Sequence, residues 1–171
     1  MTDFTIREAS TADVPALARL HVATWNATYP HVSRPPTYEL RERQWREAFA
    51  AGEANWFCLV VEGADGRLIG FAKGTPSGHP EFGGELSKIY LLGEYQRRGL
   101  GTRLLARVAR RFLERGVPSM VLFAEPTNPS CAFYEALGAE RLPGEAGAFH
   151  GGYGWRDLRG LAALCPPDEK P

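Results

Sequence analysis

The sequence has no excess of either charge, because 20 Lys and Arg residues balance 20 Asp and Glu residues. A chain without a net field has no general attraction for nucleic acid or for an anionic membrane surface. Long hydrophobic runs are also absent: the longest apolar stretch, residues 56–61, is far shorter than the roughly 20 residues that cross a bilayer. We therefore expect no nucleic-acid partner and no membrane span.

Cysteine is scarce and poorly spaced. Its three residues, Cys58, Cys131 and Cys165, are odd in number and lack the paired spacing of metal ligands. This argues against a disulfide framework and a zinc cluster, and it favours a reducing compartment. The segment Met1–Phe4 has no basic region leading into an apolar one, so no secretory signal is expected. The pattern predicts a cytoplasmic protein without a metal.

A length of 171 residues suits one domain, since domains usually hold about 100–200 residues. Hydrophobic residues make up 44% of the chain and charged residues 23%, which is a globular rather than a disordered composition. No repeat or low-complexity block divides the chain. We predict a single domain over residues 1–165 and a frayed tail over residues 166–171.

Periodicity and turn residues predict the order of helices and strands. Ser10 with Asp13 resembles a capping pair at the start of a first helix, which ends before Pro30, and Thr37 is the predicted cap of a second helix that stops near residue 52. A Gly-assisted turn joins 56–62 to 68–74 as a hairpin. The remaining predicted elements are strands 4–9, 85–92, 119–124, 139–142 and 151–156 and helices 99–115 and 130–137.

Residues 96–102, Gln-Arg-Arg-Gly-Leu-Gly-Thr, lie between an apolar strand and an amphipathic helix. The first backbone N–H groups of a helix lack intrahelical partners, and the helix dipole favours anions there. Gly99 and Gly101 leave the backbone open to a pyrophosphate. The segment is therefore predicted as a phosphate site, to which positive charge is added by Arg97, Arg98 and Arg103.

Three other interpretations of this segment exist. A P-loop would end in Gly-Lys-Ser/Thr, and a dinucleotide fingerprint would have a third glycine and a downstream acid, so both are disfavoured. The third is a glycine-containing turn between strand and helix that binds no ligand.

The segment resembles the phosphate loop of the GNAT superfamily of acetyl-CoA-dependent N-acetyltransferases. The pattern Gln/Arg-x-x-Gly-x-Gly/Ala of that loop is met by Gln96, Gly99 and Gly101. A second region of the superfamily, a strand followed by Asn and a short helix that carries Tyr, resembles residues 121–138, with Asn128 and Tyr134 at the two positions. The likeness spans roughly residues 4–156 and is specific over 85–103 and 121–139.

The resemblance implies an α/β (α+β) fold. Its central sheet would be mixed and mostly antiparallel, with about six to seven strands and about four flanking helices. The fourth and fifth strands, 85–92 and 119–124, would splay apart, and the pantetheine arm of acetyl-CoA would lie between them.

The resemblance also implies which residues bind the cofactor. Backbone N–H groups of strand 85–92 would polarise the thioester carbonyl and pair with the pantetheine amides. Asn128 either hydrogen-bonds the pantetheine arm or starts a turn before Pro129. The predicted cofactor-binding residues are Ile89, Tyr90, Leu91, Gln96, Arg97, Arg98, Gly99, Leu100, Gly101, Thr102, Arg103, Asn128 and Tyr134.

Glu85 is the predicted general base. It stands 11 positions before Gln96 (96 − 85), a separation similar to that of the glutamate base in histone-type members. A glutamate deprotonates an alkyl amine only with a raised pKa or through a water relay. The alternative is a solvated residue that merely starts a strand, and lesser candidates for the base are His79, Glu81 and His150.

Tyr134 is the predicted general acid, since a phenol with an ordinary pKa near 10 donates to a thiolate whose conjugate acid lies near 8.5. The alternative is a core aromatic with a satisfied hydroxyl. Cys131 lies beside no histidine in the sequence, which disfavours a covalent acyl-enzyme. Aromatics that border the acceptor site in the superfamily predict a substrate wall of Trp25, Tyr29, Phe82 and Tyr153.

The arginines of helix 99–115 are interpreted as a solvated face rather than a nucleic-acid patch. The sequence thus predicts an enzyme that moves acetyl from acetyl-CoA to a primary amine of a small molecule or peptide, by direct attack in a ternary complex. A non-catalytic acyl-CoA sensor and a nucleotide-binding module are the alternatives. The chain is expected to be a monomer or a homodimer.

Overall fold

The computed structural model describes residues 4–165. They pack as two compact units. The first unit consists of the described residues up to Lys73 and of Lys88–Leu104. The second unit consists of Gly74–Ser87 and of the described residues from Leu105 onward. The predicted frayed tail, 166–171, lies outside the described residues, and the single domain stays a prediction. In the part of the chain that is described, no helix is both long and apolar enough to cross a bilayer.

Within residues 4–165, seven strands form one mixed sheet with the order β1-β2-β3-β4-β5-β7-β6. The pairs β1–β2, β5–β7 and β6–β7 are antiparallel, and β4–β5 is parallel, with Gly84 opposite Met120 and Glu85 opposite Val121. This confirms the predicted fold class. The strands are β1 (Phe4–Glu8), β2 (Phe57–Gly63), β3 (Leu68–Pro76), β4 (Gly84–Leu91), β5 (Met120–Phe123), β6 (Glu140–Pro143) and β7 (Phe149–Trp155).

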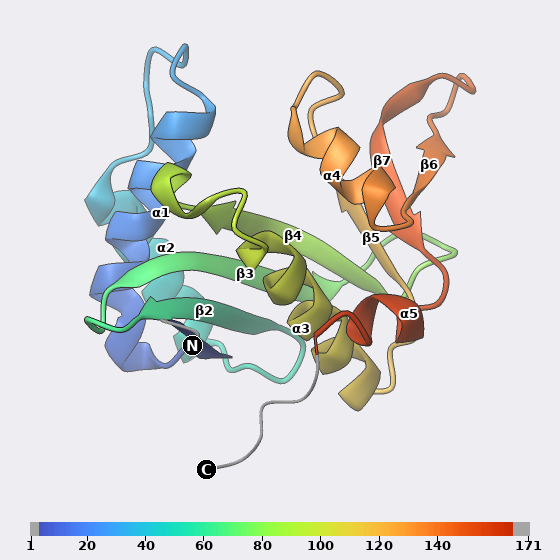
Figure 1. Ribbon diagram of the computed structural model, residues 1–171. Helices are drawn as coiled ribbons and strands as arrows, with labels where there is room; N and C mark the ends of the chain where they lie inside the picture. Colours follow the sequence, from blue (N-terminus) through green and yellow to red (C-terminus); the bar gives the residue numbers. More distant parts are fainter. Residues whose placement is uncertain (1–3, 166–171) are drawn as a thin grey trace. The chain divides into compact units, whose positions relative to one another are not determined.

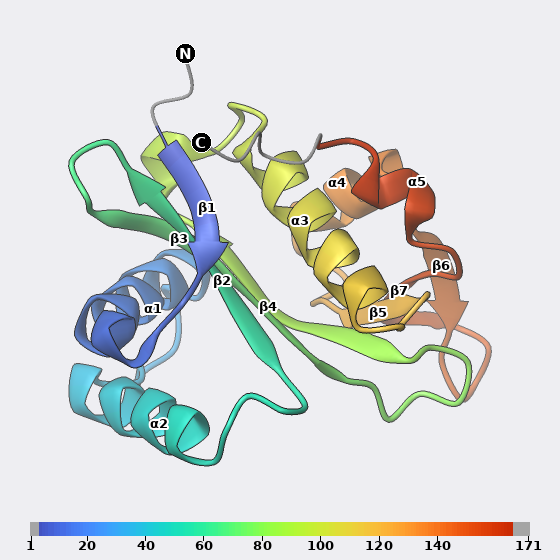
Figure 2. The same cartoon turned by 90° about the horizontal axis from the view of Figure 1, so that it is seen from below.

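The two helices of the first unit begin where the sequence predicts. Ser10 and Asp13 form a capping box, with the Ser10 N–H donating to Asp13 Oδ2 at 2.7 Å, and α1 (Val14–Thr28) follows directly. Thr37 Oγ1 accepts from the Leu40 N–H at 3.2 Å at the start of α2 (Tyr38–Ala50). Figure 2 shows α1 and α2 side by side.

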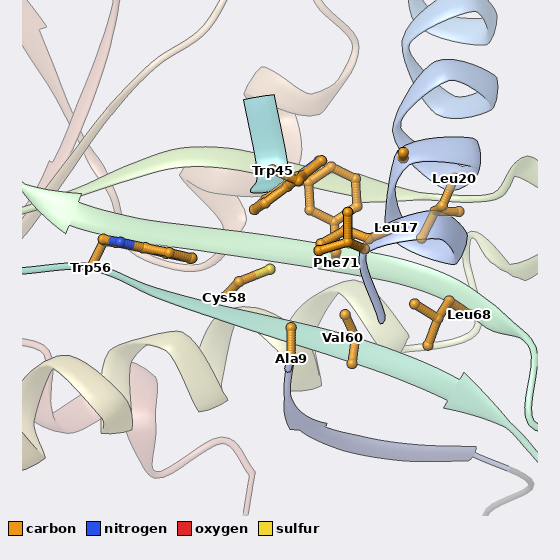
Figure 3. Packing of buried hydrophobic residues seen from close by; sticks show 11 residues of the cluster. Ala9, Leu17, Leu20, Trp45, Trp56, Cys58, Val60, Leu68 and Phe71 are labelled. Carbon is orange, nitrogen blue, oxygen red and sulfur yellow. The ribbon is translucent and has the colours of Figure 1, made fainter. Parts of the chain in front are cut away.

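The core of the first unit lies between these helices and β2 and β3 (Figure 3). Leu17 of α1, Trp45 of α2 and Phe71 of β3 are at most 3% exposed. Each such side chain contributes roughly 1.5–3 kcal/mol through removal from water. The apolar periodicity of the two helices is thus explained by burial against one face of the strands.

His21 is a buried polar residue in this core. The Trp45 Nε1–H donates to His21 Nδ1 at 3.2 Å, and the imidazole lies against the Phe71 and Tyr90 rings. Burial, and to a smaller extent the positive charges of Arg41, Lys88 and Lys73, lowers the pKa of His21 to about 3. His21 is therefore neutral at physiological pH and acts as a hydrogen-bond acceptor.

The second unit contains most of α3 (Leu100–Glu114), together with α4 (Ser130–Ala136) and α5 (Arg159–Ala162). Figure 1 shows α4 beside β6 and β7. The sequence did not predict α5 or the short 3₁₀ helix η2 (Gly93–Tyr95). Arg110 was expected to face water with its neighbours, but its guanidinium donates to the carbonyls of Ala162, at 3.1 Å, and Cys165. That arginine holds the end of α5.

The last strand is longer than predicted at its start. β7 begins at Phe149, which pairs with Pro143, whereas the sequence indicates a start at residue 151. The glycines of β7 interrupt the alternation of apolar and polar residues by which a strand is recognised in a sequence. At Gly154, a Cβ would stand 2.4 Å from Phe82 Cζ, so the close approach of the Phe82 ring explains a glycine where a strand residue was expected.

We expect acid to destabilise the protein through His21. The pKa of His21 in the folded chain, about 3, lies below the ordinary 6.5. Between these pH values His21 is therefore protonated in the unfolded chain and neutral in the folded chain. The free energy of unfolding should fall as pH drops through this window, by at most about 1.4 kcal/mol per pH unit. Urea unfolding of His21→Asn, which keeps an acceptor but does not titrate, should show a flatter profile.

The matched control is His31→Asn, which changes an exposed histidine and should leave the wild-type slope in place. An unchanged slope in His21→Asn would show that other groups govern acid unfolding.

Candidate functional site

The loop between η2 and α3 has an unusual backbone. Arg97 (φ 58°) and Gly99 (φ 78°) both have left-handed conformations, and residues 96–99 are exposed. Alternation of this kind turns successive N–H groups toward one concavity, which is a known anion-binding arrangement. The loop is anchored at both ends, because Gln96 Nε2 donates to the Leu91 carbonyl at 3.0 Å and Leu100 is 1% exposed.

The first turn of α3 supplies backbone donors. In the described residues, the backbone hydrogen bonds of α3 begin with the Arg103 N–H, which donates to the Gly99 carbonyl at 3.1 Å. The N–H groups before it have no intrahelical carbonyl to bind, so they remain available to an anion.

Arginine charge surrounds this turn. The Arg98 guanidinium lies 5.6 Å from the centre of the Tyr95 ring, and that of Arg103 lies 4.8 Å from the Phe4 ring. All residues predicted at the phosphate site, 96–103, thus meet in the first unit. So do Ile89, Tyr90 and Leu91, at the end of β4 that leads into the loop. Exposed donors and three arginines fit a diphosphate.

Tyr134 lies in the second unit, on α4, and is 6% exposed. Its ring contacts those of Phe133, Tyr153 and Trp155, with the Trp155 ring at 88° to it. The Trp155 Nε1–H also donates to the Leu137 carbonyl at 3.0 Å. The short helix that carries Tyr134 is thereby fixed against β7.

A second link between α4 and β7 runs through Glu135. The Tyr153 hydroxyl donates to Glu135 Oε1 at 2.7 Å, and Arg141 Nε donates to the same oxygen at 2.6 Å. These bonds lower the pKa of Glu135, and burial together with the Glu135 bond raises the pKa of Tyr153. Tyr153 is therefore a neutral donor.

Asn128 has the geometry of a turn residue. Its Oδ1 accepts from the Ser130 N–H at 2.9 Å, and its carbonyl accepts from the Cys131 N–H at 3.0 Å, at the start of α4. The Cys131 thiol is buried and donates to the Glu125 carbonyl at 3.5 Å. Of the two predicted roles of Asn128, the turn is the one visible here, and pantetheine binding stays a prediction.

Glu85 is half-buried on β4, next to the parallel pairing with β5. The lesser candidates have other partners: His79 Nδ1 accepts from the Glu81 N–H, and Glu81 pairs with Arg156 at 3.2 Å. His150 is exposed. Glu85 thus stays the predicted base.

The predicted substrate wall separates into two pairs. Trp25 and Tyr29 stack at 5.0 Å in the first unit and are partly exposed. Phe82 and Tyr153, in the second unit, are 2% and 0% exposed, and Phe82 packs with Val121 and Leu142 in a core cluster. The accessible surface of the predicted wall therefore belongs to Trp25 and Tyr29.

Three cations that act on the buried His21 were not singled out from the sequence. Arg41, Lys73 and Lys88 all act electrostatically on His21, although they come from α2, β3 and β4. The sequence held one sign of this group. Arg41 stands one helical turn before Trp45, so it lies on the predicted apolar face of α2, where a charged residue is unexpected.

Comparison with known proteins identifies the family. The model of the Acetyltransferase (GNAT) family matches residues 16–139. The chain belongs to the GNAT family of acetyltransferases. Over 173 residues it is 34% identical to the uncharacterized N-acetyltransferase YuaI of Bacillus subtilis, covering 94% of this chain and 97% of that one. The enzyme class is thus N-acetyltransferase, and acetyl-CoA is the acetyl donor of the GNAT family.

Two further proteins are similar to this GNAT chain. Mycothiol acetyltransferase of Saccharomonospora viridis is 34% identical over 121 residues, which cover 67% of this chain and 38% of that one. The PaiA N-acetyltransferase of Thermoplasma acidophilum, solved in complex with coenzyme A, superposes with a TM-score of 0.68 at 22% identity, covering 90% and 98% of the two chains. The latter similarity shows a shared fold. Over residues 4–165, His, Cys, Asp and Glu form no group that suits a metal ion.

We expect Gly99→Ala to weaken coenzyme A binding about tenfold. A Cβ at residue 99 would meet no atom within 4 Å, so the cost is purely the left-handed backbone, about 1–2 kcal/mol. The loop would relax away from the geometry that presents its N–H groups. Calorimetric titration with coenzyme A measures the change in Kd.

Gly93→Ala is the matched control, because residue 93 is equally open and has no left-handed φ. It should bind coenzyme A as the wild type does. Equal binding by both variants would show that the phosphates bind elsewhere.

Proposed function

We propose that this GNAT enzyme transfers the acetyl group of acetyl-CoA to a primary amine of a small molecule or peptide, by direct attack in a ternary complex. The observation that carries the proposal is the loop 96–99 with the first turn of α3, where exposed N–H groups and arginines fit a diphosphate. The coenzyme A complex of the similar PaiA protein supports it.

Residues of the first unit are assigned to the cofactor. The N–H groups of 97–102 would bind the pyrophosphate, with Arg97, Arg98 and Arg103 adding charge, and the backbone of Ile89, Tyr90 and Leu91 would pair with the pantetheine amides. Gln96 keeps the loop in place through the Leu91 carbonyl. When bound, acetyl-CoA supplies a thioester, whose carbonyl is open to attack by a neutral amine.

Proton transfer is assigned to two residues of the second unit. Glu85 would take the amine proton, directly or through water, and Tyr134 would donate to the departing thiolate. The packing of Tyr134 between Phe133, Tyr153 and Trp155 supports this role, because a fixed phenol donates without reordering. A general acid of this kind contributes roughly 10²–10⁴ in rate.

We expect Tyr134→Phe to lower kcat by about 10²-fold or more while the Kd for coenzyme A stays near the wild-type value. Release of free thiol from acetyl-CoA in the presence of a panel of amines measures turnover. Tyr38→Phe, which changes a half-buried tyrosine of α2, is the control and should retain full activity. A Tyr134→Phe enzyme with full kcat would remove the acid assignment.

Glu85→Gln tests the base. The amide cannot accept the amine proton, so kcat should fall by about 10²-fold or more, while the Kd for coenzyme A stays near the wild-type value. An unchanged kcat would remove the base assignment.

The alternative is a sensor that binds acyl-CoA without turnover. Coenzyme A binding that depends on residue 99, combined with no thiol release for any amine, would favour the sensor. Cytoplasmic location and the monomeric or homodimeric state stay predictions.

A further inference from the structure

Phe123 is an exposed aromatic residue on an interior strand of the sheet. Its strand, β5, lies between β4 and β7, yet Phe123 is 60% exposed. In the described residues, the pairing of β4 with β5 ends with Glu85 opposite Val121, so Phe123 stands two residues beyond the last pair. A large apolar side chain left in water lacks the stabilisation that burial would give.

The Phe123 ring borders a glycine of the neighbouring strand. Gly152 is the residue opposite Phe123 on β7, and a Cβ there would stand 3.5 Å from Phe123 Cε1 and 3.3 Å from Leu142 Cβ. Leu142 belongs to the buried cluster that also contains Phe82 and Val121. Phe123 is therefore the accessible end of an apolar row whose other members are buried.

Glu85 lies on the same face of the sheet as Phe123. Paired residues of neighbouring strands share a face, and successive residues of one strand alternate between the two faces. Glu85 is paired with Val121, and Phe123 is two residues after Val121. The opposite face is covered by α3, because a Cβ at Gly84 would stand 2.6 Å from Phe112 Cε1. Glu85 and Phe123 thus both face away from α3.

Helix α4 also lies on the opposite face. Its Tyr134 contacts the rings of Tyr153 and Trp155, and these two residues alternate along β7 with Gly152 and Gly154. The sheet therefore separates Tyr134, the proposed acid, from the face that carries Glu85 and Phe123. An acceptor that approaches Glu85 on that face meets neither helix.

Glu85 and Phe123 are close enough to hold the two ends of one small molecule. Two residues along a strand span about 6.6 Å and neighbouring strands lie about 4.8 Å apart, so their Cα atoms are separated by roughly 8 Å. Both residues belong to the second unit. Because Glu85 is half-buried and Phe123 is exposed, a carboxylate that attracts an ammonium group adjoins an open apolar surface.

We propose that the acceptor is a primary amine with an apolar hydrocarbon tail, whose nitrogen lies at Glu85 and whose tail covers the Phe123 ring. The inference rests on the proposed acetyltransferase function and names its substrate class as apolar-tailed amines. Contact with the tail removes the ring from water, which is favourable. A hydroxyl or a second ammonium group at the same place would lose part of its hydration without a partner.

The test measures kcat/KM along a series of linear primary amines from propylamine to heptylamine. Release of free thiol at saturating acetyl-CoA gives the rates. Complete burial of one methylene group is worth about fourfold in binding, and a surface that covers one side of the chain should give about half of that free energy, or about twofold. We expect kcat/KM to rise about twofold per methylene group and to level off once the tail extends past the ring.

Amino alcohols and diamines of the same lengths are the polar counterparts. At the length that gives the highest kcat/KM, the alkylamine should exceed both by about fivefold or more. A preferred diamine would instead indicate that the ring binds a second cation.

Phe123→Ala should flatten the series, so that heptylamine loses about tenfold in kcat/KM relative to propylamine, with the KM for acetyl-CoA unchanged. Phe123→Leu keeps an apolar surface and should retain most of the rise. The matched control is Leu164→Ala, which truncates another exposed apolar residue of the second unit, 50% exposed, and should leave the series as in the wild type.

Three results would each overturn the inference: a wild-type series without a rise, an amino alcohol or diamine that equals the alkylamine, or a Phe123→Ala series as steep as that of the wild type. Acetylation of any amine would still leave the proposed function standing.

If coenzyme A binds but no amine is acetylated, the proposed function fails. Calorimetric titration of hexylamine and of 5-aminopentan-1-ol into the coenzyme A complex then decides the inference by itself. Hexylamine binding that Phe123→Ala weakens about fivefold supports it. Absence of hexylamine binding, or equal binding of the two compounds, overturns it.

Discussion

The start of α3 imposes the constraint on which the cofactor assignment depends. A helix begins with N–H groups that no carbonyl of its own can accept, and here they follow a loop with two left-handed residues, Arg97 and Gly99. Burial of Leu100 and the bond from Gln96 to Leu91 hold the loop at its two ends. The donors are therefore arranged before any anion arrives, so binding incurs little reorganisation.

Buried polar side chains in this protein have defined partners, and the partner decides the charge. His21 accepts from Trp45 and stays neutral, whereas Tyr153 donates to Glu135, which keeps its negative charge beside Arg141. Burial penalises the charged form of each group, and a hydrogen bond offsets this penalty only when it is made to the charged form. Exceptions among the described residues include Arg41 Nε and Arg110 Nη1, which are buried without a hydrogen-bond partner.

Membership of the GNAT family establishes the reaction class without establishing the acceptor. The residues assigned to cofactor binding in the first unit follow a local motif, which explains why the sequence alone could predict them. The cations that act on His21 follow no motif. Arg41, Lys73 and Lys88 lie on three different elements, and only the folding of α2 against β3 and β4 brings their charges to one imidazole.

Several elements were predictable because their causes are local. The capping residues Ser10 and Thr37, the turn between β2 and β3, and the glycines before α3 act within a few positions. Composition and spacing therefore indicated the helices, the hairpin and the loop before α3. The ends of β7 and the presence of α5 depend on distant partners, namely Phe82 against Gly154 and Arg110 on the carbonyls of Ala162 and Cys165. Contacts between residues so far apart in the chain leave no periodic pattern in the sequence.

The sequence by itself thus determined the fold class and the family resemblance, and it predicted the position of the phosphate loop, since each arises from residues close together in the chain. Only the tertiary structure decided which aromatics are buried and which are accessible, and that His21 is a neutral acceptor. The physical reason is that burial, pKa and electrostatic field are sums over neighbours in space, and those neighbours come from separate parts of the chain.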